Sequence, residues 1–438
     1  MQLNDDGRCN GATQSHVIFQ KAGSPCPDVI MWKFTQILML VLMLLSLFSC
    51  MQTDIVYENL SIHNSKQLAL KAASTEQIIV GAEQVSYYLP MLQNKRVGLV
   101  VNQTSMVGDK HLVDVLIDNN IEVQTIFAPE HGFRGDHDAG EKFSSSIDAK
   151  TGVPLVSIYG KNRKPSADIM AKLDVVIFDI QDVGVRFYTY ISSMHYMMEA
   201  TAETGIAFIV FDRPNPNGAF VDGPILEPEF SSFVGMHKIP LVHGMTVGEL
   251  AQMFKGEGWL NTQTPLDLKV ISLKNYQRTM LYSLPVKPSP NLPNDIAINL
   301  YPSLGFFEST PVSIGRGTEF PFQVIGHNKI SLGQFSFMPI STPNAASKPK
   351  LMNKQLVGQD LRNSQVRGLD LNFIIEWHKV FKAQNIEFFT RASFMDKLSG
   401  TDKLRKAIVA GKTAQEIKLS WQDDLVKFKA ARKPYLLY

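Results

Sequence analysis

The sequence predicts an α/β fold, in which a parallel-sheet domain is followed by a smaller α+β auxiliary domain. Between Arg96 and Ile271, short apolar runs alternate with segments whose apolar residues recur at helical spacing. Such alternation is typical of a parallel sheet with helices on both faces. After about Lys274 the alternation loosens and proline clusters appear, which indicates a change of architecture.

Strands are expected where β-branched and other apolar residues form short runs. The run Leu173–Ile180 is apolar on both faces, which is typical of a fully buried central strand. In chain order, the expected strands are Arg96–Val101, Ile121–Phe127, Leu155–Tyr159, Leu173–Ile180, Ile206–Phe211 and Leu268–Ile271.

Helices are expected between these strands. The first has its apolar side chains on one face and Asp109 as a candidate N-cap. The third is rich in Met and Ala, and the last begins with Thr246 and Glu249 at the spacing of a capping box. In order, these helices are Lys110–Asn119, Pro165–Lys172, Thr189–Thr204 and Thr246–Lys255.

The remainder predicts a mixed domain with weak strands and several helices. We place the sheet domain at residues 81–264 and the auxiliary domain at residues 265–438. The expected elements of the second are strands Gln323–Ile325 and Gln334–Phe337 and helices Leu371–Lys382, Asp402–Ala410 and Ala414–Ala431.

The N-terminal region predicts an exported lipoprotein. Ile37–Leu47 is apolar apart from Ser46, too short for a comfortable membrane span, and it ends near Cys50 in a pattern that resembles a bacterial lipobox. We expect residues 1–49 to be a leader, with Met31 as a possible true start. Residues 50–80 would be a lipidated Cys50 and a tether to a periplasmic domain. A plain signal anchor is the alternative.

Composition and missing motifs exclude several classes of function. The formal net charge of +2 and the lack of a basic stripe argue against nucleic acid as a partner. All three cysteines lie at or before Cys50, so no internal disulfide is expected in the body of the protein. The sequence lacks glycine-rich phosphate loops, a Gly-x-Ser-x-Gly elbow and a His-Glu-x-x-His motif. We therefore expect no cofactor and no metal.

Ionisable residues follow several of the predicted strands. Because ligands of open α/β sheets bind beyond the carboxyl ends of the strands, these residues predict one assembled site. Glu130 follows Pro129 and precedes Phe133, so a raised pKa and a role as general acid are expected. The alternative is a loop carboxylate that pairs with Arg134.

Other candidates could bind a polar ligand or stabilise the fold. Asp179, Asp182 and Asp212 could serve as carboxylate ligands or as caps of turns and helices. A guanidinium can grip a carboxylate through two hydrogen bonds, although a single arginine is often structural. The arginine candidates are Arg134, Arg186 and Arg316, and the uncharged or titratable ones are His131, Tyr188, His243 and Asn291.

Seven runs of this sequence together resemble one family. They are Gly98–Thr104, Phe127–Gly135 with Ala139-Gly140-Glu141, Phe178–Tyr190, Asp212–Gly218, His243–Thr246, Pro288–Pro293 and Gly315–Thr318. The chain resembles the exo-β-N-acetylmuramidases, bacterial glycoside hydrolases once known only as a domain of unknown function. The likeness spans roughly residues 80–438.

The resemblance implies a Rossmann-like domain that binds no nucleotide, a smaller auxiliary domain, and an active site between them. It implies release of N-acetylmuramic acid from the non-reducing end of peptidoglycan fragments, and it indicates Glu130 as catalytic. Glycoside cleavage needs an acid and a second group on the other face of the sugar. We assign that second role to Asp182, with Asp179 and Glu308 as rivals, unless the substrate's acetamido group acts instead.

The remaining candidates are assigned to substrate binding. Arg134, Arg186 and Arg316 would hold the lactyl carboxylate, and the sugar would be bound by His131, Asp179, Tyr188, Asp212, His243 and Asn291. Two other functions stay open. One is a metal-dependent hydrolase that uses Asp179, Asp182, Asp212 and His131. The other is a lipid-anchored binding protein for cell-wall sugars without turnover.

Overall fold

A computed structural model describes residues 77–134 and 146–438, and Ile78–Tyr438 belong to one compact unit. The predicted leader, Cys50 and most of the tether lie outside the described residues. In the described part, no helix combines the length and apolar character needed to cross a bilayer.

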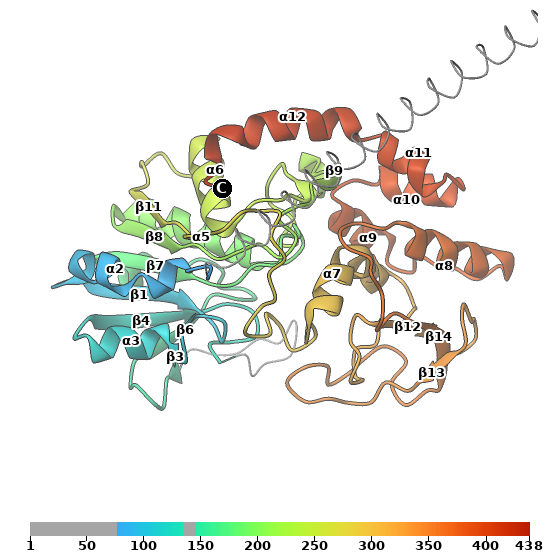
Figure 1. Ribbon diagram of the computed structural model, residues 1–438, viewed down its shortest axis with the longest axis horizontal. Helices are drawn as coiled ribbons and strands as arrows, with labels where there is room; N and C mark the ends of the chain where they lie inside the picture. Colours follow the sequence, from blue (N-terminus) through green and yellow to red (C-terminus); the bar gives the residue numbers. More distant parts are fainter. Residues whose placement is uncertain (1–76, 135–145) are drawn as a thin grey trace, which may run out of the picture. The chain divides into compact units, whose positions relative to one another are not determined.

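A mainly parallel sheet organises the N-terminal part of this unit, which confirms the predicted α/β class (Figure 1). Within the described residues it has seven strands, and only the edge strand β5 runs antiparallel to its neighbour. Across the sheet the order is β11 (Leu268–Ile271), β8 (Ala207–Phe211), β7 (Val175–Asp179), β1 (Arg96–Val101), β4 (Glu122–Ala128), β6 (Pro154–Ser157) and β5 (Ser146–Ile147).

Helices cover both faces of this sheet. Side chains alternate between the two faces along a strand, so Leu99 and Val101 pack with α2 (Val85–Leu92) and α3 (Leu112–Asp118). Val100 instead joins the core formed with α5 (Tyr190–Thr204) and α6 (Val247–Gly256). The capping box predicted at Thr246 and Glu249 is present at the start of α6.

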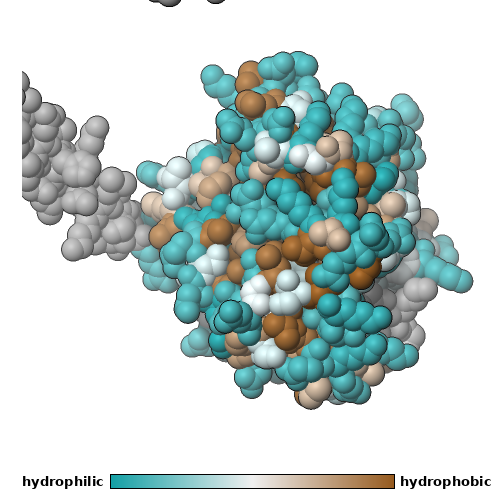
Figure 2. Space-filling model, turned by 90° about the vertical axis from the view of Figure 1, so that its right-hand side faces the viewer, coloured by the Kyte–Doolittle hydropathy of each residue, from teal (hydrophilic) through white to brown (hydrophobic). Residues whose placement is uncertain are grey.

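The C-terminal part packs on the same core as α5 and α6. Leu300, Trp377 and Leu425 belong to the hydrophobic cluster that contains Val100. Its elements are α7 (Asp295–Leu304), η3 (Gly305–Ser309), the antiparallel sheet β12 (Val324–His327), β14 (Leu356–Asp360) and β13 (Phe335–Phe337), and helices α8 (Asn372–Ala383), α9 (Ala392–Ser399), α10 (Lys403–Val409), α11 (Ala414–Leu419) and α12 (Gln422–Arg432). Figure 2 shows the face at the α8 end, where apolar areas are separated by hydrophilic surface.

Short elements complete the described fold. They are η1 (Gly81–Glu83), the hairpin β2 (Met106–Val107) and β3 (Lys110–His111), α4 (Ala167–Met170), the pair β9 (Asp222–Ile225) and β10 (Pro240–Val242), η2 (Pro228–Phe230) and η4 (Lys433–Tyr435).

Two expectations about local structure are wrong. The helix expected from Lys110 begins at Leu112, because Lys110 and His111 pair with Met106 and Val107 in a hairpin. Its N-cap is His111, whose side chain accepts from the backbone N–H of Val113, and not Asp109. The single helix expected over Ala414–Ala431 is broken at Trp421 into α11 and α12.

The direction of the strands positions the site. Strand β1 pairs in parallel with β4 and β7, and β7 pairs in parallel with β8, so the carboxyl ends of these strands lie at one edge of the sheet. Glu130 follows β4 by two residues, Asp179 ends β7 and Asp212 follows β8. The sequence correctly placed these three residues at one edge of the sheet. Their surroundings differ from one residue to the next, as described below.

Candidate active site

A pocket lies where the segment after β4 meets the start of α5 and residues of the C-terminal part. It holds about 380 Å³, part of it open to solvent. Five predicted site residues line it together with six that were not predicted. The lining residues are Glu130, His131, Phe187, Tyr188, Thr189, Ser289, Asn291, Leu292, Tyr301, Arg316 and Phe322.

The carboxylate of Glu130 is held by two hydroxyl groups. Tyr159 donates to its Oε1 at 2.9 Å and Thr189 donates to its Oε2 at 2.8 Å. Tyr159 lies just beyond β6 and Thr189 is the N-cap residue of α5, so two different strand–helix connections orient one carboxylate. Sequence reasoning missed both hydroxyls, since neither belongs to a charged cluster.

The backbone and side chain of His131, the residue after Glu130, are both constrained. His131 is buried and has a left-handed backbone with φ of 69°, a conformation that costs free energy for a residue with a Cβ atom. Its Nε2 lies 3.3 Å from the hydroxyl of Ser289, which comes from the proline-rich loop of residues 288–293. The histidine thus connects the β4 loop to a segment more than 150 residues away.

Aromatic rings form one wall of the pocket. The Tyr188 hydroxyl donates to the carbonyl of Pro288 at 2.6 Å, and its ring packs edge-on against Tyr190 and Tyr301. Burial raises the pKa of Tyr188 and Tyr301 well above the ordinary tyrosine value, so both phenols are neutral at physiological pH. This wall offers apolar ring surface of the kind that packs against sugar rings.

Arg316 supplies a positive charge to the pocket. Its Nε donates to Glu308 Oε1 at 2.7 Å, and its guanidinium carbon lies 5.0 Å from the centre of the Phe322 ring. Within the described residues its two Nη nitrogens have no hydrogen-bond partner. Burial raises the pKa of Glu308, but Arg316 and Lys350 outweigh burial and hold it below its usual value. The free edge of the guanidinium is therefore available to an anion.

Asn291 also lines the pocket, although its amide nitrogen already donates one hydrogen bond within the protein. Its Nδ2 donates to the carbonyl of Ala345 at 2.8 Å, and the side chain is buried. This bond joins the proline-rich loop to the loop that follows β13.

The other predicted arginines are engaged elsewhere. Arg134 binds Asp148 through contacts of 2.9, 3.1 and 3.3 Å, and neither residue lines the pocket. Arg186 is fully buried and donates to the carbonyls of Pro224, Ile239 and Ser399 at 2.6 to 2.9 Å. Burial lowers the pKa of Arg186 to about 9. Carbonyl oxygens accept from its two Nη nitrogens, whereas its Nε is buried without a hydrogen-bond partner.

Two of the predicted aspartates stabilise the strand ends. Asp179 accepts two hydrogen bonds from Arg213, at 2.6 and 2.9 Å, in a fully buried ion pair. Asp212 accepts from the hydroxyls of Thr246 and Tyr438 and from the backbone N–H of Gly248 at the start of α6. Neither aspartate lines the pocket.

Asp182 and His243 are buried and lie close to each other. Asp182 Oδ2 accepts from the backbone N–H of Gly184 at 2.6 Å, and His243 Nε2 lies 3.9 Å from that oxygen. Burial raises the pKa of Asp182 to about 7 and lowers that of His243 to about 3. Neither residue lines the pocket.

The carboxylates proposed for the metal-dependent alternative thus have separate partners. Among residues 77–134 and 146–438, no group of three or more His, Cys, Asp or Glu side chains is placed to hold a metal ion.

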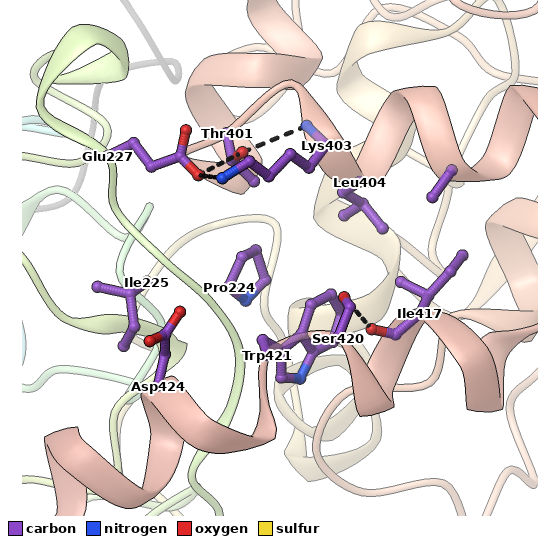
Figure 3. A pocket seen from close by; sticks show the side chains of 11 residues that line it. Pro224, Ile225, Glu227, Thr401, Lys403, Leu404, Ile417, Ser420, Trp421 and Asp424 are labelled. Carbon is purple, nitrogen blue, oxygen red and sulfur yellow. Dashed lines mark hydrogen bonds and ion pairs between the residues drawn. The ribbon is translucent and has the colours of Figure 1, made fainter.

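A second pocket lies between the segment around β9 and helices α10–α12, and it shares no residue with the first (Figure 3). Its polar side chains form ion pairs or hydrogen bonds with one another or with neighbouring residues. Glu227 binds Lys403 at 2.7 Å and accepts from Thr401 at 3.0 Å. Trp421 donates to Asp222 at 3.0 Å. The pocket containing Glu130 is therefore the better candidate for catalysis.

Comparisons with known proteins agree over most of the chain. The models of the exo-beta-N-acetylmuramidase NamZ family match residues 97–296 with the N-terminal domain and residues 299–438 with the C-terminal domain. The peptidoglycan beta-N-acetylmuramidase NamZ of Bacillus subtilis (strain 168) is 41% identical over 373 residues, which cover 80% of this chain and 89% of that protein.

Solved structures of similar fold come from Bacteroides fragilis NCTC 9343. One DUF1343 family protein is 47% identical with a TM-score of 0.76, and the match covers 83% of this chain and 99% of that one. A second is 29% identical with a TM-score of 0.71, covering 82% and 99%. The chain therefore belongs to the exo-β-N-acetylmuramidase family, as its sequence motifs predicted.

Proposed function

We propose that this protein is an exo-acting glycoside hydrolase that releases N-acetylmuramic acid from the non-reducing end of peptidoglycan fragments, with Glu130 as the general acid. The observation that carries the proposal is the position of the Glu130 carboxylate, in the pocket and fixed at both oxygens. A fixed carboxyl group at a pocket wall can protonate the oxygen of a glycosidic bond.

The surroundings of the candidate carboxylates support a route that needs no second protein carboxylate. Asp182 and Asp179 are buried outside the pocket lining, and Glu308 is ion-paired with Arg316. Among the described residues that line the pocket, Glu130 is the one carboxylate. This arrangement supports attack by the acetamido oxygen of the substrate itself, a route that needs one protein acid and retains the anomeric configuration.

Recognition of muramic acid is assigned to Arg316. The lactyl carboxylate distinguishes this sugar from N-acetylglucosamine, and a guanidinium edge can bind it through two charge-assisted hydrogen bonds. His131, Tyr188 and Asn291 line the same pocket and would contact the hydroxyl and acetamido groups. Arg134 and Arg186 are left out of this assignment because neither lines the pocket and both are bound to other residues.

The direct test uses a chromogenic N-acetylmuramide beside the matching N-acetylglucosaminide. We expect selective release from the muramide, and β-N-acetylmuramic acid as the first product seen by proton NMR. Equal or absent release would contradict the function. An α-product would instead keep the function and rule out assistance by the acetamido group.

Export and lipid anchoring are part of the same proposal. The support is the apolar run Ile37–Leu47 ahead of Cys50, and the cell-wall substrate, which lies outside the cytoplasm. Cys50→Ser is expected to move the protein from the membrane fraction to the soluble fraction of its host, since the acylated residue is lost. A Cys26→Ser control should remain membrane-bound, and an unchanged distribution of Cys50→Ser would refute lipidation.

A further inference from the structure

Arg163 is a cation near Tyr159, the residue that donates a hydrogen bond to Glu130. It belongs to none of the family-like motifs and does not line the pocket. It lies in the loop between β6 and α4, four residues after Tyr159. Its guanidinium carbon is 4.3 Å from the centre of the Phe233 ring. Its Nε is buried without a hydrogen-bond partner, and no described residue forms an ion pair with it. By contrast, the adjacent Lys164 binds both Glu199 and Glu203.

The surroundings of Arg163 are aromatic and partly open. The Phe233 ring lies 6.0 Å from that of Tyr159 and is stacked at 6.4 Å on that of Tyr196, and all three rings are half-buried. Burial raises the pKa of Tyr159, and the charge of Arg163 opposes that rise, which places the guanidinium near the phenol that binds Glu130. An arginine stacked on a ring keeps its in-plane N–H donors free for a carboxylate.

The two oxygens of the Glu130 carboxylate have different neighbours, one associated with Arg316 and the other with Arg163. Glu130 Oε2 contacts Thr189, which lines the pocket together with Arg316. Glu130 Oε1 accepts a hydrogen bond from Tyr159, which does not line the pocket. The ring of Tyr159 in turn lies against that of Phe233. In an exo-acting hydrolase the pocket holds the terminal sugar, so the Tyr159 side faces the part of the substrate that leaves.

We propose that Arg163, supported by Phe233, binds a carboxylate on the leaving part of the substrate. In peptidoglycan fragments that carboxylate comes from the lactyl group of the next N-acetylmuramic acid or from a peptide stem attached to it. The inference rests on the proposed function and extends it. Arg316 selects the sugar that is released, and Arg163 selects longer fragments by the charge of what remains.

The test compares Arg163→Gln with wild type on three substrates. The first is a chromogenic N-acetylmuramide, which has no carboxylate beyond the terminal sugar. The second is a tetrasaccharide of alternating N-acetylmuramic acid and N-acetylglucosamine without peptides, and the third carries a peptide stem on the inner muramic acid. We expect unchanged kcat/KM on the first substrate and a KM raised about tenfold on at least one of the others, the loss of one charge-assisted contact.

The three substrates distinguish between the two possible sources of the carboxylate. A raised KM on the second substrate assigns the lactyl carboxylate, and one on the third substrate alone assigns the peptide stem. An equal loss on all three substrates, or no change on any, overturns the proposal. Arg163→Lys should recover part of the affinity because it restores the charge.

A matched control distinguishes the loss of the Arg163 contact from a general effect of the protein's net charge. Lys161→Gln removes one positive charge from an exposed position two residues away and should leave all three substrates unaffected. Release of the chromophore by wild type tests the proposed function independently. An inactive wild type rejects that function, whereas an active wild type with an indifferent Arg163→Gln rejects the second anion site alone.

Discussion

Replacement of Glu130 by glutamine is expected to lower kcat on peptidoglycan fragments by more than about 1000-fold, with KM close to that of wild type. The amide has the shape of the carboxyl group and can keep the contacts to Tyr159 and Thr189, so the fold should be preserved. It cannot deliver a proton to the glycosidic oxygen. Steady-state kinetics on a defined disaccharide would measure the effect.

The nature of the leaving group makes this test specific for a general acid. A nitrophenolate leaves without protonation, so Glu130→Gln should lose much less activity on a nitrophenyl muramide than on the disaccharide. Equal losses on both would assign Glu130 a different role, and a rate within about tenfold of wild type would remove it from the mechanism. Glu122→Gln, at the exposed start of the same strand, is the matched control and should behave as wild type.

Replacement of Arg316 by methionine is expected to abolish the preference for muramic acid. The loss of charge-assisted hydrogen bonds to the lactyl carboxylate corresponds to about 1.5–3 kcal/mol, or roughly 10- to 100-fold in kcat/KM. The N-acetylglucosaminide lacks that carboxylate, so its slow hydrolysis should not change. The ratio of the two kcat/KM values is the measurement.

Structural damage would give a different pattern. Arg316 also binds Glu308, but Lys350 lies 3.7 Å from the other oxygen of Glu308 and remains as its partner in the variant. If the substitution only disturbed the wall, both substrates would lose activity in parallel. Lys329→Met, which removes an exposed cation from the same region, should leave the ratio as in wild type.

The position of the candidate pocket could be predicted from the sequence because the ends of the strands are marked by local patterns. Hydrophobic runs and turn residues locate each strand, and parallel strands bring their carboxyl ends to one edge. Glu130, His131 and Tyr188 were found in this way, since each lies within a few residues of a strand end or of the helix that follows. Asn291 and Arg316 were found through loops rich in proline or glycine.

The partners of these residues could not be predicted in the same way. Buried polar groups must be satisfied wherever the chain turns, and a carboxylate or arginine at a strand end serves that purpose as readily as it serves a ligand. Asp179, Asp212 and Arg186 serve it here through contacts with residues 34 to 213 positions away. Tyr159, Thr189 and Arg163 carried no signal because single hydroxyls and loop arginines are common.

Missed elements have similarly local explanations. Helix α7 contains Pro302, and it follows a proline-rich loop that suggested irregular structure. Helix α9 is short and has Gly400 as its C-cap residue. Strand β14 is the central strand of its small sheet, although its pattern is only partly apolar. Tertiary packing stabilises all three more than intrinsic propensity does.

The buried guanidinium of Arg186 has a consequence for the evolution of this enzyme. Its acceptors are main-chain carbonyls from β9, from the residue before β10 and from the end of α9, and every amino acid supplies such an oxygen. Side chains at Pro224, Ile239 and Ser399 can therefore drift without loss of the cross-link, provided that the backbone path is kept. Arg186 itself cannot be replaced in this way. Even lysine, which keeps the charge, lacks the planar fork of donors that reaches three acceptors at once.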